Sequence, residues 1–125
     1  MQAIFETLCS THSRDNQLIK KLWEEISDRY SEPHRYYHTL DHLRDIYLLL
    51  LPLKEDLEWD TILFALFYHD IIYHIPSTTN EKQSAELAKR QLRKLDFSPK
   101  LMSRIHSMII ATQVHSSQDK NTQFF

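Results

Sequence analysis

The chain of 125 residues contains no glycine. Hairpin turns and β-bulges depend on glycine, because it adopts positive φ at little cost. At the average usage, a chain of this length would hold about nine glycines. The glycine-rich phosphate loops of the Walker and dinucleotide-binding types are excluded as well, because their backbones must approach the phosphate closely. An all-α fold is therefore expected, and any phosphate chemistry has to use side chains or a metal ion.

Length and charge narrow the class of protein further. The chain is long enough for one domain, residues 1–125, and too short for two. Its 15 Lys and Arg nearly balance its 17 Asp and Glu, and no basic block stands out, so neither a nucleic acid polymer nor a membrane surface is expected as a partner. Cys9 is the single cysteine, so an internal disulfide is excluded. No segment resembles a signal peptide. Apolar runs such as residues 47–53 are too short to span a bilayer. We expect a soluble, cytoplasmic protein with a small partner.

Apolar residues at helical spacing predict about five helices. In the first predicted helix, for example, Leu18, Leu22 and Ile26 lie four residues apart, with charged residues on the other sides. The third predicted helix is apolar on most sides, as a central helix would be. Start signals are Thr39, a capping box that begins at Thr78, and the pair Ser98–Pro99. The predicted helices cover approximately residues 15–30, 39–51, 60–73, 78–95 and 98–112.

Histidine and aspartate occur side by side in an apolar run, "FALFYHDIIYH" at residues 64–74. Charged groups are rarely buried without a partner. His69 is either a hydrogen-bonded core residue, with Asp70 turned to solvent, or both side chains reach one metal ion. A second pair, His38 and His42, is four residues apart and shares a helix face if the helix begins by His38. These two histidines are either partly exposed residues at a helix start or part of the same site. Imidazole nitrogens and a carboxylate oxygen from two helices suit a divalent metal.

The sequence also resembles a known family in four segments that occur in the same order. They are "YHTLDH" (37–42), "ALFYHDIIYH" (65–74), "NEKQSAELA" (80–88) and "MIIATQVH" (108–115). Together they resemble the HD-domain superfamily of metal-dependent phosphohydrolases, and within it a branch of small bacterial predicted phosphohydrolases. The first two segments are also similar to the helix pair of cyclic-nucleotide phosphodiesterases. The resemblance covers nearly the whole chain and implies an HD-domain-like helical bundle that hydrolyses a phosphate ester, possibly a nucleotide.

The resemblance implies a metal-centred mechanism. His42, His69 and Asp70 would be ligands of a divalent ion, whether Mn, Fe, Mg, Zn, Ni or Co. The ion would polarise the phosphoryl group and lower the pKa of a bound water. His38 would then be the catalytic proton donor to the leaving-group oxygen.

Three further residues are expected near the substrate. Arg35 would hold a phosphate oxygen, although a solvated surface position explains it equally well. Glu81 would orient a water or a histidine, but its capping-box role is a complete explanation by itself. His115 matches a histidine of the same branch, and the alternative is a helix-end histidine that interacts with the last carbonyls.

The sequence departs from the family in two places. The family completes its site with an aspartate on a later helix, and here only Asp119 follows, in a polar stretch. We therefore expect a bundle that lacks the family's later helices, with weakened metal affinity and exposed apolar surface that leads to homo-oligomers. "HDIIY" also stands where His-Asp-x-Gly-Lys is frequent, so the substrate is specified only as a small phosphorylated molecule. The alternatives are a catalytically impaired metal- or nucleotide-binding module and a structural bundle whose histidines are incidental.

Overall fold

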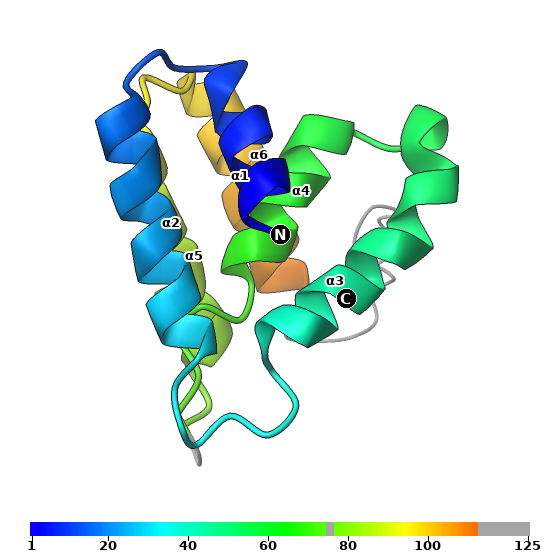
Figure 1. Ribbon diagram of the computed structural model, residues 1–125, viewed down its shortest axis with the longest axis vertical. Helices are drawn as coiled ribbons and strands as arrows, with labels where there is room; N and C mark the ends of the chain where they lie inside the picture. The colour runs from blue at the N-terminus through cyan, green and yellow to red at the C-terminus, as the bar shows by residue number, and fades with distance from the viewer. Residues whose placement is uncertain (75–76, 113–125) are drawn as a thin grey trace.

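A computed structural model describes residues 1–74 and 77–112 (Figure 1). Every regular element in this part of the chain is a helix and none is a β-strand, so the all-α prediction is confirmed. The helices α2 and α5 run along one side of the molecule, α1, α4 and α6 lie between, and α3 continues into a short 3₁₀ helix, η1, on the other side (Figure 1). Their bounds are α1 Gln2–Ser10, α2 Asn16–Tyr30, α3 Leu40–Leu50, η1 Leu51–Asp56, α4 Trp59–Tyr68, α5 Asn80–Arg93 and α6 Pro99–Ala111.

The helix α4 is the centre of the bundle. Every residue from Thr61 to Tyr68 is buried, which agrees with the apolar character that this segment shows on all sides. It packs against α1, α3, α5 and α6. Each large apolar side chain that is buried in this way contributes roughly 1.5–3 kcal/mol, so α4 contributes more to the core than its ten residues suggest.

The helix α1 is absent from the sequence prediction. It has nine residues, and its N-cap residue makes no side-chain cap hydrogen bond. A helix this short is marginal in isolation and gains its stability from packing. Phe5 supplies that packing, since its ring centroid lies 5.9 Å from that of Trp23 and 5.1 Å from that of Phe67. The nearby thiol of Cys9 is fully buried, and this burial raises its pKa to about 12.

The predicted helix starts agree with the structure to within two residues, but the capping differs. Ser98 accepts a hydrogen bond from the Leu101 amide, as its sequence signal indicates. Thr39 occupies the N-cap of α3, yet its side chain makes no cap hydrogen bond. The N-cap of α5 is Thr79, one residue after the predicted capping box begins at Thr78.

The chain turns without glycine after α5. Among the described residues, Asp96 is the position with positive φ, at 59°. Aspartate is one of the few residues other than glycine that visit this left-handed region, because its short side chain can hydrogen-bond locally. A single aspartate thus takes the place of the usual glycine in the connection to α6.

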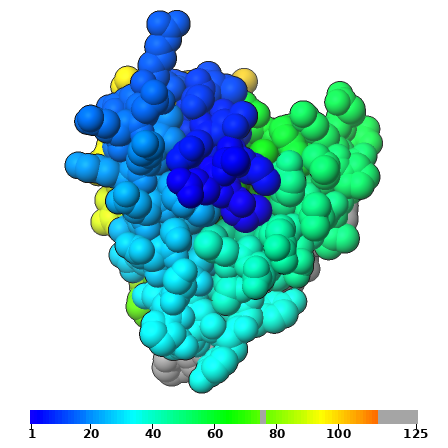
Figure 2. Space-filling view, in the orientation of Figure 1, coloured from blue at the N-terminus to red at the C-terminus, as the bar shows by residue number. Residues whose placement is uncertain are grey.

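Several large apolar side chains are exposed on α3, on η1 and in the loop before them. Figure 2 shows α3 and η1 as a lobe beside α1, and a cavity of about 400 Å³ lies between α1, α4 and this lobe. Self-association through this surface stays a prediction. None of the described helices combines the length and the apolar character needed to cross a membrane. The exposed apolar residues are Tyr36, Tyr37, Leu48, Leu49 and Leu51.

The difference in capping gives a paired test. We expect Ser98→Ala to destabilise the protein by about 0.5–2 kcal/mol, because the Leu101 amide loses its acceptor. Thr39→Ala is the matched control and should cost clearly less, since its hydroxyl caps nothing. Urea unfolding followed by circular dichroism measures both, and equal losses would contradict this account of the two caps.

Candidate metal centre

The site begins where α4 ends, at Tyr68, and not at residue 73 as the apolar run predicts. In the last hydrogen bond of the helix, the His69 amide donates to the Ala65 carbonyl at 2.8 Å. The hydroxyl of Tyr30 then takes over at the helix end: it donates to the Phe67 carbonyl at 2.9 Å and accepts from the Asp70 amide at 3.2 Å. His69 and Asp70 therefore lie in a turn that a buried side chain from α2 holds in place.

Arg35 ties this turn to the loop before α3. Its Nη1 donates to the carbonyls of Asp70 at 2.7 Å and His38 at 3.1 Å, and its Nη2 donates to the Ile71 carbonyl at 2.7 Å. Its Nε donates to the Glu32 carboxylate at 3.1 Å. We refer to these four contacts as the Arg35 clamp. These contacts hold the backbone at His38 and the backbone at Asp70 and Ile71 in a fixed position relative to each other.

The clamp differs from the role that the sequence predicted for Arg35. The side chain is completely buried, and four of its five N–H groups are directed to backbone carbonyls and to Glu32. The residue does not line the cavity that Asp70 faces. Its geometry is that of a positioning group behind the site, and it is not placed to hold a substrate phosphate.

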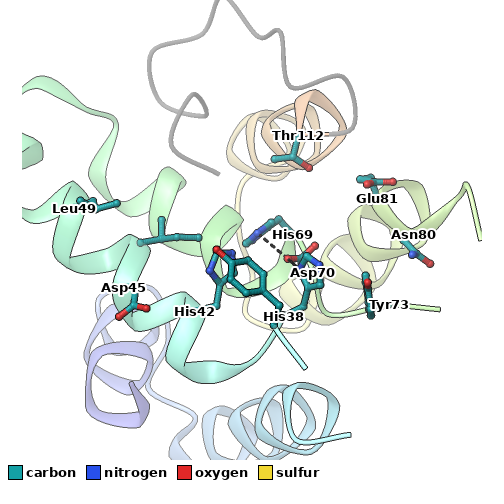
Figure 3. A pocket seen from close by; sticks show the side chains of 12 residues that line it. His38, His42, Asp45, Leu49, His69, Asp70, Tyr73, Asn80, Glu81 and Thr112 are labelled. Carbon is teal, nitrogen blue, oxygen red and sulfur yellow. Dashed lines mark hydrogen bonds and ion pairs between the residues drawn. The ribbon is translucent and has the colours of Figure 1, made fainter. Parts of the chain in front are cut away.

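Two histidines converge on one carboxylate oxygen. His38 Nδ1 lies 2.9 Å from Asp70 Oδ2, and His69 Nε2 lies 3.2 Å from the same atom (Figure 3). The other ring nitrogen of His69, Nδ1, lies 2.7 Å from the Leu66 carbonyl. A carbonyl can only accept, so this Nδ1 carries a proton, and in a neutral His69 the unprotonated Nε2 faces the carboxylate.

Two acceptors cannot face each other at that distance without a positive charge between them. A proton on Nε2 can supply that charge. Burial lowers the pKa of His69, but the adjacent Asp70 carboxylate outweighs this effect and raises it above its ordinary value. Burial raises the pKa of Asp70, while His69 and His38 hold it well below its usual range. A divalent cation satisfies the same pair of groups, and the proton would leave when the metal binds.

His42 adds a third imidazole from α3. Burial and the nearby His69 lower its pKa, which favours the neutral form that binds metals. Possible ligand atoms of His38, His42 and Asp70 all lie within 4.8 Å of one another, so this group could hold a metal ion. This group differs from the predicted ligand set in one member, since it contains His38 in place of His69. His69 contacts the same aspartate, with its Nε2 3.2 Å from Asp70 Oδ2.

The group opens into a cavity of about 570 Å³. Its wall is built from α3, the turn after α4, and the ends of α5 and α6 that face it (Figure 3). Imidazole nitrogens and carboxylate oxygens suit Zn, Mn, Fe, Co or Ni. They suit soft metal ions less well, because those prefer thiolate ligands and no thiol takes part here. The lining residues are Tyr37, His38, His42, Asp45, Ile46, Leu49, His69, Asp70, Tyr73, Asn80, Glu81 and Thr112.

The remaining predicted residues divide into two groups. Glu81 lines the cavity, in the first turn of α5. His115 and Asp119 lie outside the described residues. Two cavity residues that the sequence analysis did not single out are Asp45 and Tyr73. Asp45 was open to prediction, because it follows His42 by three residues on the same face of α3.

The chain matches no protein-family model, no curated protein and no solved structure in the comparisons. The case for a metal centre therefore rests on the geometry of these residues.

The Arg35 clamp predicts a large effect from a substitution that keeps the charge. Arg35→Lys should destabilise the protein by about 3 kcal/mol or more, because a single ammonium cannot reach all the carbonyls and leaves buried acceptors unpaired. Arg29→Lys is the control, since Arg29 pairs with Glu25 on the surface of α2 and should change stability by less than about 1 kcal/mol. Chemical denaturation measures both, and a neutral Arg35→Lys would contradict the clamp.

Metal content tests the site itself. After incubation with Mn²⁺, Fe²⁺ or Zn²⁺ and gel filtration, we expect elemental analysis to find near-stoichiometric metal in the parent and none in Asp70→Asn. The chain offers a matched control in Asp60, which lies 3.1 Å from His12 Nε2 in a second histidine–aspartate pair. Asp60→Asn should retain the metal. Equal metal in all three proteins, or none in the parent, would contradict the site.

Proposed function

We propose that this protein is a metal-dependent phosphohydrolase that cleaves a phosphate ester in the cavity beside His38, His42 and Asp70. One observation supports the proposal: the imidazoles of His38 and His69 converge on the same Asp70 oxygen, at 2.9 and 3.2 Å. The imidazole of His42 lies within ligand distance, and the group is at the wall of a cavity large enough for a small substrate. The resemblance to the HD-domain superfamily supports the same reaction.

The donor set fits a divalent ion held by Asp70, His42 and His69, with His38 as the proton donor beside them. When bound, such an ion would polarise the phosphoryl group and lower the pKa of a water molecule. The protein side of the reaction is to hold these ligands rigidly, through Tyr30 and the Arg35 clamp, and to keep the imidazoles neutral. His42 meets the second requirement, because burial lowers its pKa.

His38 is suited to handle the proton of the leaving group. Asp70 accepts from its Nδ1, which leaves Nε2 as the nitrogen that can carry a second proton. The side chain is 30% exposed and lines the cavity, so a substrate can reach it. In the balanced reaction, water adds its oxygen to phosphorus and releases one proton to solvent, the bond between phosphorus and the ester oxygen breaks, and that oxygen takes a proton from His38, which regains one from solvent. The products are inorganic phosphate and an alcohol.

A second function is favoured by one specific observation. No lysine or arginine is among the described residues that line the cavity, and Arg35 is occupied by its clamp. Besides the metal and the protonated His38, a phosphate would therefore meet only neutral donors. This favours, as the alternative, a module that binds metal and a phosphorylated ligand without turnover.

Turnover of two esters separates these functions and tests His38. We expect the metal-loaded parent to hydrolyse both p-nitrophenyl phosphate and an alkyl phosphate, and Asp70→Asn to hydrolyse neither. His38→Ala should lose about 10²–10⁴-fold on the alkyl ester, whose basic leaving group needs a proton. It should lose much less on p-nitrophenyl phosphate, whose leaving group is weakly basic.

Phosphate release and metal content are measured on the same samples. Loss of metal in His38→Ala would make His38 a ligand and overturn its assignment as proton donor. Metal and phosphate binding by the parent without any turnover would favour the binding module over the enzyme.

A further inference from the structure

The charges around the cavity are unbalanced. Its described lining contains three carboxylates, those of Asp45, Asp70 and Glu81, and no lysine or arginine. Asp70 is engaged by two histidines. Asp45 and Glu81 make no hydrogen bond or ion pair that the structure records with another described residue. The cavity therefore carries two carboxylates whose charge the described protein does not neutralise.

These two carboxylates lie on different sides of the histidine–aspartate group. Asp45 comes from α3 and Glu81 from α5, and Figure 3 shows them flanking His38, His42 and Asp70. Asp45 is exposed, whereas Glu81 is half-buried. Because solvent screens an exposed charge more strongly, Glu81 should act on a bound ligand more strongly than Asp45 does.

The charge of a substrate follows from this arrangement. A divalent ion and the doubly protonated His38 of the proposed function together balance the three carboxylates, and a phosphomonoester dianion then leaves two negative charges in excess. A second anionic group on the substrate would meet further carboxylates and neutral side chains, but no lysine or arginine of the described lining. A cationic group would find Glu81 on one side of the cavity and Asp45 on the other.

We propose that the cavity selects phosphomonoesters whose alcohol part carries an ammonium group, with Glu81 as the principal residue that recognises the cation and Asp45 as a weaker one. The inference rests on the proposed function for the placement of the phosphoryl group beside the metal. It goes further by assigning the other end of the substrate.

Three esters of similar size test the charge directly: aminoethyl phosphate, propyl phosphate and carboxymethyl phosphate, which carry a cationic, neutral and anionic alcohol part. Two readouts are made on the metal-loaded full chain, the Kd from calorimetry and the rate of phosphate release. We expect aminoethyl phosphate to bind about fivefold or more tightly than propyl phosphate, and carboxymethyl phosphate to bind more weakly than either. The preference should shrink as salt is added.

Variants assign the preference to residues. Glu81→Gln should remove most of the difference between the cationic and neutral esters, and Asp45→Asn should remove a smaller part. Asp41→Asn is the matched control, because Asp41 lies on α3 but outside the cavity lining, 3.7 Å from Arg44. It should leave the preference unchanged.

Each outcome bears on one proposal or the other. Equal Kd values for the three esters, tighter binding of the carboxymethyl ester, no binding of any ester, or a preference that survives Glu81→Gln would overturn the inference. If propyl phosphate is hydrolysed as well as aminoethyl phosphate and bound equally, the inference fails while the proposed function stands. If aminoethyl phosphate binds most tightly but no ester is hydrolysed, the ligand class is supported and the proposed enzymatic function fails.

Discussion

The end of α4 at Tyr68 is the constraint on which the site depends. His69 is the C-cap residue and keeps right-handed helical dihedrals, and its Nε2 lies 3.2 Å from Asp70 Oδ2. The chain leaves the helix at this point. The backbone groups that the helix would have paired find other partners, since Tyr30 accepts from the Asp70 amide and Arg35 donates to the carbonyls of Asp70 and Ile71.

These substitute partners are side chains at the base of the site, so stability and function share one set of interactions. Buried backbone groups are costly when they are unpaired, which makes Tyr30 and Arg35 necessary for the fold. The same contacts orient the carboxylate and the imidazoles before any metal arrives. Ser84 extends the arrangement to α5, because its hydroxyl accepts from the Ile72 amide at 3.0 Å. Two helices, α2 and α5, and the loop before α3 thus hold one short turn.

The sequence was informative about most helices and about which residues gather at the site, but not about the end of α4. Periodicity located α2, α3, α5 and α6, since their apolar faces and start signals are local. The apolar run continues to residue 73, and no local signal stops the helix earlier. The stop comes from partners 36 residues away at Arg35 and 40 residues away at Tyr30, which no local pattern shows. The sequence also predicts a substrate contact for Arg35. It does not show that Arg35 is buried, because burial is a property of the whole fold.

The second histidine–aspartate pair of the chain shows why proximity alone does not indicate a metal centre. His12 Nε2 lies 3.1 Å from Asp60 Oδ2, as close as the pairs in the site. Its ring packs against Phe97, with centroids 4.7 Å apart, and no further histidine or carboxylate joins the pair in a ligand group among the described residues. The carboxylate of that pair is also more exposed to solvent than that of Asp70. At Asp70 one oxygen of a half-buried carboxylate faces two imidazoles, with a third close by. The number of donors around one carboxylate, more than any single distance, makes a divalent ion the fitting partner.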